Sequence, residues 1–230
     1  MGVQLDEAGL QQIEHGTLQL LAQHKAVGHA INGIVEPDVA QYTHLGDAST
    51  KTDGLPYDPS LKPGDLVQSG FGWRTAFNAP AKQVQKLDAQ GLPPQLFLGA
   101  LGMPGLTAYA GLMRVAGFKP GDVVFVSGGA GAVGSMVAQI AKLKGGTVVA
   151  TAGGPEKVAF LKEIGVDHAI DYKAGNLTEA VTKAVPGGID IYFDNVGGDH
   201  LEAAMTAAKN HARFAICGGI SAYNNIGAAP

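Results

Sequence analysis

VVFVSGGAGAVGSMVAQIAKLKG, residues 123–145, joins an apolar run to an amphipathic stretch through a glycine-rich turn. The run predicts a buried parallel strand, and the apolar residues that follow the turn recur at the spacing of one helix face. Between them, Gly129, Gly131 and Gly134 form the pattern G-x-G-x-x-G. In this position the first glycine permits a tight turn, the second lets backbone approach a pyrophosphate, and the third lets helix pack on strand. The helix N-terminus adds unpaired amides, so the stretch predicts a dinucleotide-binding turn.

Apolar runs continue to alternate with amphipathic segments beyond this stretch. Pro155 suits the first turn of a helix, Asn176 and Glu179 have the spacing of a capping box, and Asp199 is expected to cap a further helix. The alternation predicts an α/β fold with a doubly wound parallel sheet of the Rossmann type, incomplete at the C-terminus because no sixth strand follows. The later strands are expected at TVVATA (147–152), HAIDY (168–172), IDIYF (189–193) and RFAIC (213–217).

The first half of the chain has a weaker pattern. The turn signal KPGDLV, residues 62–67, opens a small β region that continues through FGWRTAF and KQVQKLD. Apolar spacing predicts a helix near residues 6–24, and residues 25–55 show no clear period. We therefore treat residues 1–55 as an unassigned segment and residues 56–98 as a partial β domain ahead of the Rossmann domain, residues 99–230.

Composition argues against several classes of protein. A net charge of −4 without a basic run argues against a nucleic-acid partner. The single cysteine, Cys217, excludes an internal disulfide and a thiolate metal cluster within one chain, and it favours a reducing, cytoplasmic setting. The opening residues carry no signal-peptide pattern, and no window reaches the length of a membrane span. We therefore expect no metal, no membrane and no nucleic acid.

The end of the second strand decides between NAD and NADP, because an NAD site places Asp or Glu there to take the ribose hydroxyls. Here Gly153 and Gly154 occupy that position, and Lys157 follows one turn into the helix. A missing carboxylate with a nearby cation favours the 2′-phosphate of NADP. Glu156 is explained by its place in the first turn of the helix, where an acidic residue is favourable. A solvated surface lysine is the alternative interpretation of Lys157.

Six motifs follow one another between about Leu61 and Asn225: LGMPGLTAYAGL, GGAGAVGSMVAQIAKLKG, GGPEK, IDYK, YFDNVGG and ICGGISAYN. In this order they resemble the zinc-independent medium-chain dehydrogenases/reductases, specifically the prostaglandin reductase, leukotriene hydroxydehydrogenase and curcumin reductase group. The resemblance implies NADPH-dependent reduction of the carbon–carbon double bond of α,β-unsaturated ketones and aldehydes. It also implies a GroES-like catalytic domain, here only partial at residues 56–98, and a homodimer.

Carried over position by position, the resemblance assigns roles to single residues. Lys157 and Tyr172 are expected on the adenosine 2′-phosphate, and Cys217 becomes a small buried strand residue rather than a nucleophile. Tyr223 matches the family tyrosine that orients the nicotinamide ribose and assists protonation, and it is the expected catalytic residue. The expected cofactor-binding residues are Met103, Thr107, Gly129, Gly131, Ala132, Val133, Gly134, Lys157, Tyr172, Asn195, Cys217, Gly218, Ile220, Ser221 and Tyr223, with no metal ligand.

The sequence departs from this family on the substrate side. Residues 1–55 do not resemble the opening strands, a substrate-side motif with Tyr and Arg is absent, and so is the part that returns to the barrel. Two alternatives therefore stay open beside enone reduction: a truncated reductase that binds NADPH or a partner without turnover, and a quinone reductase of the same fold. A methyltransferase that uses AdoMet is disfavoured because the second strand lacks an acidic residue to hold the ribose.

Overall fold

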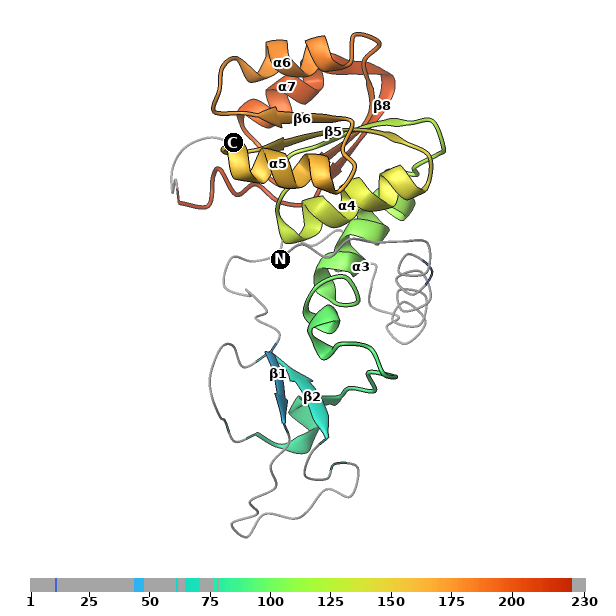
Figure 1. Cartoon of the computed structure of the whole chain (residues 1–230), viewed down its shortest axis with the longest axis vertical. Coiled ribbons are helices and arrows are strands. Elements are labelled where there is room, and N and C mark those ends of the chain that lie inside the picture. The colour runs from blue at the N-terminus through green and yellow to red at the C-terminus, as the bar shows by residue number, and fades with distance from the viewer. Residues whose placement is uncertain are drawn as a thin grey trace.

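The computed structural model describes residue 11, residues 44–47, 61, 65–70, 77 and 79–224 (Figure 1). The helix expected over residues 6–24 lies outside the described residues, apart from Gln11. Within the described part, no helix is both long enough and apolar enough to span a bilayer.

A small antiparallel sheet precedes the Rossmann region. Its order is β1-β2-β3, with β1 at His44–Asp47, β2 at Leu66–Ser69 and β3 at Gln85–Lys86. Strand β2 follows the KPGDLV turn as expected, whereas β1 falls in a stretch for which the sequence predicted no element. The reason is its length, since four residues containing one apolar side chain give no readable alternation. Two short helical turns, η1 (Ala81–Gln83) and η2 (Pro94–Leu98), lead onward. Assignment of this region to a GroES-like domain stays a prediction.

Five parallel strands form the main sheet, in the order β6-β5-β4-β7-β8. This is the order of a doubly wound sheet, so the predicted fold class is confirmed. The order reverses between β4 and β7, and in such sheets ligands bind beyond the carboxyl ends of the strands at that point. The strand bounds are Val123–Val126 for β4, Thr147–Ala152 for β5, His168–Asp171 for β6, Ile189–Asp194 for β7 and Ala208–Ile216 for β8.

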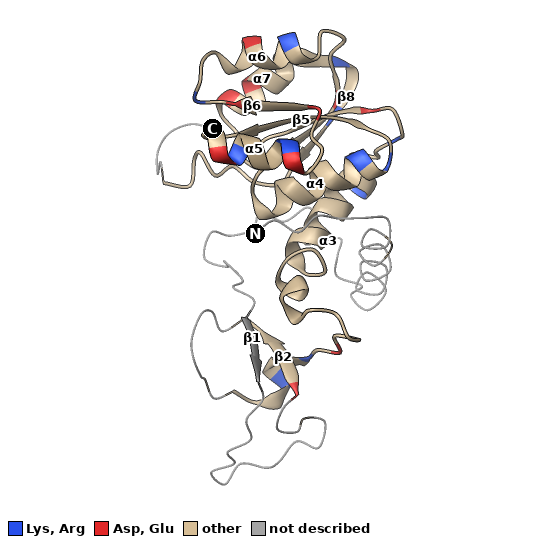
Figure 2. Ribbon diagram, viewed as in Figure 1, with Lys and Arg blue, Asp and Glu red and all other residues tan. Residues whose placement is uncertain are grey.

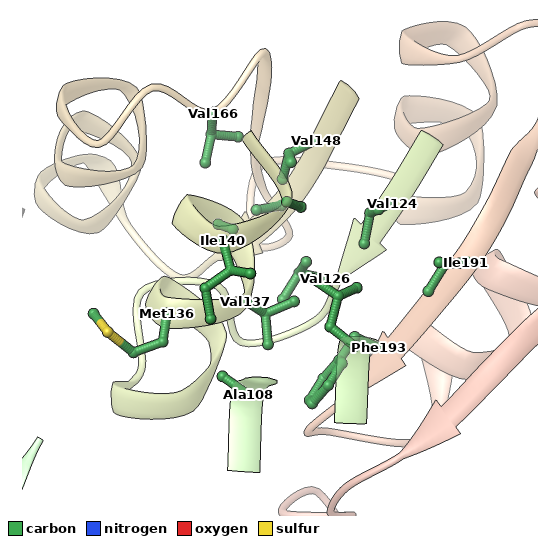
Figure 3. Close-up of a cluster of buried hydrophobic side chains, with 14 of the residues drawn as sticks. Ala108, Val124, Val126, Met136, Val137, Ile140, Val148, Val166, Ile191 and Phe193 are labelled. Atoms are coloured by element: carbon green, nitrogen blue, oxygen red, sulfur yellow. The ribbon is translucent and has the colours of Figure 1, made fainter. Parts of the chain in front are cut away.

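Helices cover both faces of this sheet (Figure 1). On one face, α3 (Met103–Tyr109), its π-helical continuation η3 (Ala110–Val115), α4 (Ala132–Leu143) and α5 (Pro155–Glu163) enclose one apolar cluster. Figure 3 shows part of this cluster, where Val137 and Ile140 of α4 pack against Val124 and Val126 of β4. On the other face, α6 (Leu177–Ala184) and α7 (Asp199–Ala207) enclose a second cluster around Phe125. The sheet is therefore the middle layer between two layers of helices. The carboxyl ends of its five parallel strands all lie at one edge.

The two expected helix caps have different outcomes. Asn176 caps α6, because its Oδ1 accepts a hydrogen bond from the Glu179 amide at 3.1 Å, which confirms the first half of the expected capping box. The Glu179 carboxylate accepts from the Asn176 side-chain amide at 3.3 Å rather than from its backbone amide. The expectation that Asp199 caps α7 is wrong. Gly198 is the N-cap residue, with φ of 53°, and Asp199 is the first helical residue. The backbone at the cap position adopts a conformation that favours glycine, so the acidic residue falls one position later, where the helix dipole still favours it.

Candidate cofactor site

The glycine turn between β4 and α4 is packed too tightly for side chains. A Cβ at Gly129 would lie 2.7 Å from the Cβ of Ala150, and a Cβ at Gly134 would collide with the carbonyl oxygen of Gly128. Gly131 is the N-cap of α4 and makes no side-chain cap hydrogen bond. The Gly131 amide donates to the Gly128 carbonyl oxygen at 2.9 Å, so the first amide open to an external acceptor is that of Ala132, the exposed first residue of α4. These features fit a bound phosphate, since unpaired amides at a helix N-terminus attract anions.

A buried carboxylate, Asp194, ends β7 and orders the loop that follows it. Asp194 is 1% exposed, and its Oδ1 accepts hydrogen bonds from the amides of Val196 (2.8 Å) and Gly197 (2.7 Å). The same oxygen accepts the hydroxyls of Ser127 (3.0 Å) and Tyr192 (2.7 Å). Burial, together with the Asp194 charge, raises the pKa of Tyr192, so this hydroxyl stays protonated and donates. Tyr192 is fully buried and is a core residue.

Ser127 joins the glycine turn to this loop. Its Oγ accepts a hydrogen bond from the Asn195 amide at 2.9 Å, and the side-chain Nδ2 of Asn195 donates to the Ser127 carbonyl oxygen at 2.8 Å. Because Ser127 directly precedes the turn and is completely buried, the loops after β4 and β7 are held together at the point where the strand order reverses.

The loop after β8 packs against the same residues. The amides of Cys217 and Gly218 donate to the carbonyl oxygen of Asp194 at 2.8 and 3.0 Å, and the Ser221 hydroxyl donates to the Val196 carbonyl oxygen at 2.6 Å. The expected residues 217–221 are thereby brought beside Asn195, which in turn is bonded to the glycine turn. The structure therefore unites three of the predicted segments at one edge of the sheet.

Cys217 is exposed, which corrects the expectation that it is a buried strand residue. Strand β8 ends at Ile216, so Cys217 lies in the loop beyond the sheet. Desolvation by the surrounding chain and the Asp194 charge nevertheless raise the pKa of the Cys217 thiol. A thiol with a raised pKa is a poor nucleophile at neutral pH, so this part of the prediction remains reasonable.

Tyr223, the expected catalytic residue, is 63% exposed and lies on the loop after β8. Its hydroxyl accepts a hydrogen bond from the Gly219 amide at 3.3 Å. A Cβ at Gly218 would lie 3.1 Å from the same hydroxyl, so the phenol rests against the backbone of this loop. The O–H group is left to donate outward. Its catalytic role stays a prediction.

The end of β5 meets the turn after β6. A Cβ at Gly153 would lie 2.9 Å from the Tyr172 hydroxyl, so the tyrosine covers the position at which an NAD site carries a carboxylate. Asp171 binds the Gly154 amide at 3.1 Å, and this hydrogen bond, with one from the Lys173 amide, lowers the pKa of Asp171. Lys157 is exposed on α5.

Met103 and Thr107 lie one turn apart on α3, which packs against α4. Met103 is 48% exposed and Thr107 is half-buried. Their expected position beside the nicotinamide stays a prediction.

A pocket of about 290 Å³ lies between the turn after β6 and the first turns of α6 and α7. Tyr172 and His200 form part of its lining, and their rings meet edge to face with centroids 5.1 Å apart. His200 is only 5% exposed, and its burial lowers the pKa of the imidazole. The negative charges of Asp194 and Asp199 act to raise this pKa, but burial outweighs them, so the imidazole is neutral at pH 7. No cluster of three or more potential metal ligands occurs among the described residues.

Sequence reasoning missed Ser127, Asp194 and His200 as parts of the site. Asp194 lay inside the quoted motif YFDNVGG, and its place at the end of a buried strand was a usable signal. Ser127 carried no signal beyond preceding a glycine, because its partners lie 67 and 68 residues away in sequence.

A doubly wound sheet with a glycine turn after the strand at its reversal point defines a Rossmann-type α/β protein. The profile of the family described as zinc-binding dehydrogenase matches residues 132–229. Prostaglandin reductase 1 of Bos taurus is 51% identical over 165 residues, which are 70% of this chain and 50% of that protein. The NADP(+)-dependent 2-alkenal reductase of Nicotiana tabacum is 45% identical over 170 residues, 73% of this chain and 50% of that protein.

Among solved structures, CurA from Vibrio vulnificus in complex with NADPH matches with a TM-score of 0.69 and 42% identity, covering 74% of this chain and 50% of that one. The chain belongs to the medium-chain dehydrogenase/reductase family, in the zinc-independent branch of NADP-dependent reductases. It spans about half the length of the curated relatives it matches.

Proposed function

We propose that this protein binds NADPH and uses it to reduce the carbon–carbon double bond of small α,β-unsaturated ketones and aldehydes. The observation that carries the proposal is the tightly packed glycine turn, which leads into the open N-terminus of α4 and adjoins an end of β5 that lacks a carboxylate. Similarity to prostaglandin reductase 1 and to a 2-alkenal reductase supports the reaction class. A cytoplasmic location and a homodimer belong to the same proposal.

Each of the loops contributes one part of cofactor binding in this proposal. The backbone of Gly131 lies against the pyrophosphate, and the Ala132 amide at the start of α4 donates to it. Lys157 and Tyr172 receive the 2′-phosphate. Asn195 and the loop 217–223 continue the site toward the nicotinamide. Ser127 does not touch the cofactor in this account, because it is buried and acts through Asn195.

The reaction needs a hydride donor, a hydrogen-bond donor and a proton. NADPH supplies the hydride, which adds to the β-carbon of the substrate. The π pair of the carbon–carbon double bond then forms a double bond between the α-carbon and the carbonyl carbon, and the carbonyl π pair moves onto the oxygen to give an enolate. Tyr223 stabilises this enolate by donating a hydrogen bond from its hydroxyl. A water then protonates the α-carbon, which yields the saturated carbonyl compound. The Gly219 amide holds the Tyr223 oxygen from the other side and leaves its O–H to donate.

The proposal is tested by titrating the protein with NADPH and with NADH by fluorescence, and then adding 3-nonen-2-one while absorbance at the nicotinamide band is followed. We expect tight NADPH binding, weak NADH binding and enone-dependent oxidation. The Tyr223→Phe variant is expected to bind NADPH normally and to lose about 10²-fold in kcat. Absence of NADPH binding by the unmodified protein would overturn the proposal.

A second candidate is NADPH binding without turnover. The observation that favours it is exposure at the expected nicotinamide end, since Met103, Ile220 and Tyr223 are all exposed. Hydride transfer is helped by exclusion of water, and these described residues do not exclude it. Normal NADPH binding without oxidation in the presence of an enone would support this candidate. Oxidation by a quinone but not by an enone would support quinone reduction instead.

A further inference from the structure

Lys173 lies where the turn after β6 crosses the end of β5. A Cβ at Gly153 would lie 3.0 Å from Cε of Lys173 and 2.9 Å from the hydroxyl of Tyr172. The Lys173 ammonium lies 5.9 Å from the centroid of the Tyr172 ring. Both side chains thus extend over the glycine that stands where NAD-binding sites carry an acidic residue.

The backbone of this turn is fixed by Asp171. One carboxylate oxygen accepts the Gly154 amide at 3.1 Å and the Lys173 amide at 3.0 Å, so it ties the turn after β5 to the turn after β6. The Tyr172 amide adds a hydrogen bond to the carbonyl oxygen of Ala152 at 3.2 Å. Lys173 therefore starts from a fixed backbone position, which lowers the entropy cost of holding its side chain at a ligand.

Among the described residues no ion pair engages the Lys173 ammonium, although the Asp171 carboxylate lies close by in sequence and attracts it. The Asp171 oxygen that accepts two amides is already occupied. Figure 2 shows Lys and Arg interspersed with Asp and Glu along the helices and strands around the five-stranded sheet. Recognition of a phosphate at Gly153 must therefore come from individual cations beside it.

We propose that Lys173 is a specificity-determining residue, which binds the 2′-phosphate of NADPH beside Tyr172 and adds a second cation to Lys157. This inference rests on the proposed function, because it concerns the cofactor of that same site. The two lysines come from different elements, α5 and the turn after β6, and would approach the phosphate from two directions. A charge-assisted hydrogen bond of this kind discriminates strongly between NADPH and NADH, which lacks the phosphate.

The competing explanation is that Lys173 only lies over the ring of Tyr172 and remains solvated. Cation–π contacts at exposed sites contribute little, and such a contact would not distinguish ligands with a 2′-phosphate from ligands without one. The test must therefore compare matched ligands. Adenosine 2′-monophosphate and adenosine 5′-monophosphate form one such pair, and NADPH and NADH form the second.

The experiment uses the full chain and the variant Lys173→Met, which removes the charge and keeps an unbranched side chain over Tyr172. Lys183→Met is the matched control, because Lys183 is an exposed lysine in the last turn of α6. Dissociation constants are measured by calorimetry for the two monophosphates and by fluorescence for the two dinucleotides. Lys173→Arg serves as the conservative variant that retains the charge.

We expect Lys173→Met to weaken binding of adenosine 2′-monophosphate and NADPH by about tenfold and to leave adenosine 5′-monophosphate and NADH unchanged. Lys173→Arg should bind within about threefold of the unmodified protein, and Lys183→Met should equal it. Equal affinities of Lys173→Met and the unmodified protein for NADPH would overturn the inference while the proposed function stands. Equal losses for both members of each pair would also overturn it. Failure of the unmodified protein to bind NADPH would instead overturn the proposed function.

Discussion

At the residue scale, the most restrictive glycine of the turn between β4 and α4 is Gly134, where α4 passes over that turn. A Cβ there would collide with the Gly128 carbonyl oxygen and lie 2.9 Å from the Cα of Gly129, so backbone rather than a flexible side chain would have to move. We expect Gly134→Ala to lower the free energy of unfolding by about 1–3 kcal/mol, as overpacking does elsewhere, and to weaken NADPH binding.

Urea unfolding and NADPH titration check this expectation. Gly187→Ala is the matched control, because a Cβ at Gly187 meets nothing within 4 Å and its φ is not positive. A Gly134→Ala variant as stable as Gly187→Ala would contradict the packing argument.

Asp167 gives a prediction about pH. Partial burial acts to raise its pKa, but Lys142, whose Nζ lies 2.7 Å from Oδ1, and the Val148 amide at 2.7 Å from Oδ2 outweigh burial and hold the pKa below its usual value of 3.8. A folded-state pKa below the unfolded value adds stability above pH 3.8, and this stability is lost as pH falls through the lower folded value.

We therefore expect Asp167→Asn to lower the free energy of unfolding by about 1 kcal/mol at neutral pH, a modest figure because the pair is partly exposed. The difference from the unmodified protein should shrink steadily as the pH falls below 3.8. Urea unfolding of both proteins over a pH series measures it. A difference that stays constant down to the acid limit would contradict the assignment.

At the scale of elements, the residues that follow the carboxyl ends of β4 and β7 hold each other in place. Ser127 and Asn195 exchange two hydrogen bonds, at 2.9 and 2.8 Å, so either residue depends on the other for its position. We expect Ser127→Ala and Asn195→Ala each to weaken NADPH binding by about tenfold, and the double variant to be hardly weaker than either one.

NADPH titration of the four proteins forms a double-mutant cycle, with circular dichroism as the check that each is folded. Losses that simply multiply in the double variant would mean that Ser127 does not act through Asn195. Tyr192→Phe is a useful comparison, because it removes another buried hydrogen bond to Asp194 without touching Asn195.

Local pattern was enough to predict the strands and helices from β4 onward, because the apolar strands alternate with amphipathic helices that have their own stop signals. The helices α3 and η3, which precede β4, were not predicted. It failed where a single position decided the outcome. Asp199 was taken as a cap because aspartate favours that role, but Gly198 has a positive φ that the sequence could not reveal. The resemblance implied a buried Cys217 within the last predicted strand, whereas that strand stops one residue earlier.

The candidate site was predictable only in part, for the same kind of reason. The glycine turn is formed by neighbouring residues of one short segment, so the G-x-G-x-x-G pattern was enough to predict it. The network around Asp194 joins residues far apart in sequence, and no local period encodes such contacts. Lys173 was also missed, since its position over Gly153 depends on two turns that meet only in the folded chain.

At the scale of the whole molecule, the loops that follow the five strands of the doubly wound sheet all lie at one edge of that sheet. The proposed cofactor site is formed by these loops. Asp194 ties the loops after β4, β7 and β8 together, and Asp171 ties the turn after β5 to the turn after β6. The five strands thus present a continuous set of loops to one extended ligand. The central claim is that this ligand delivers a hydride to the β-carbon of an enone.

The most direct measurement is isotope transfer from NADPH that carries deuterium at C4 of the nicotinamide, with each of the two prochiral forms used in turn and 3-nonen-2-one as substrate. Nuclear magnetic resonance then locates the label in the product. The account predicts deuterium at the β-carbon from one of the two forms, with the new hydrogen at the α-carbon coming from solvent. Deuterium at the carbonyl carbon, or a saturated product without label from either form, would contradict it.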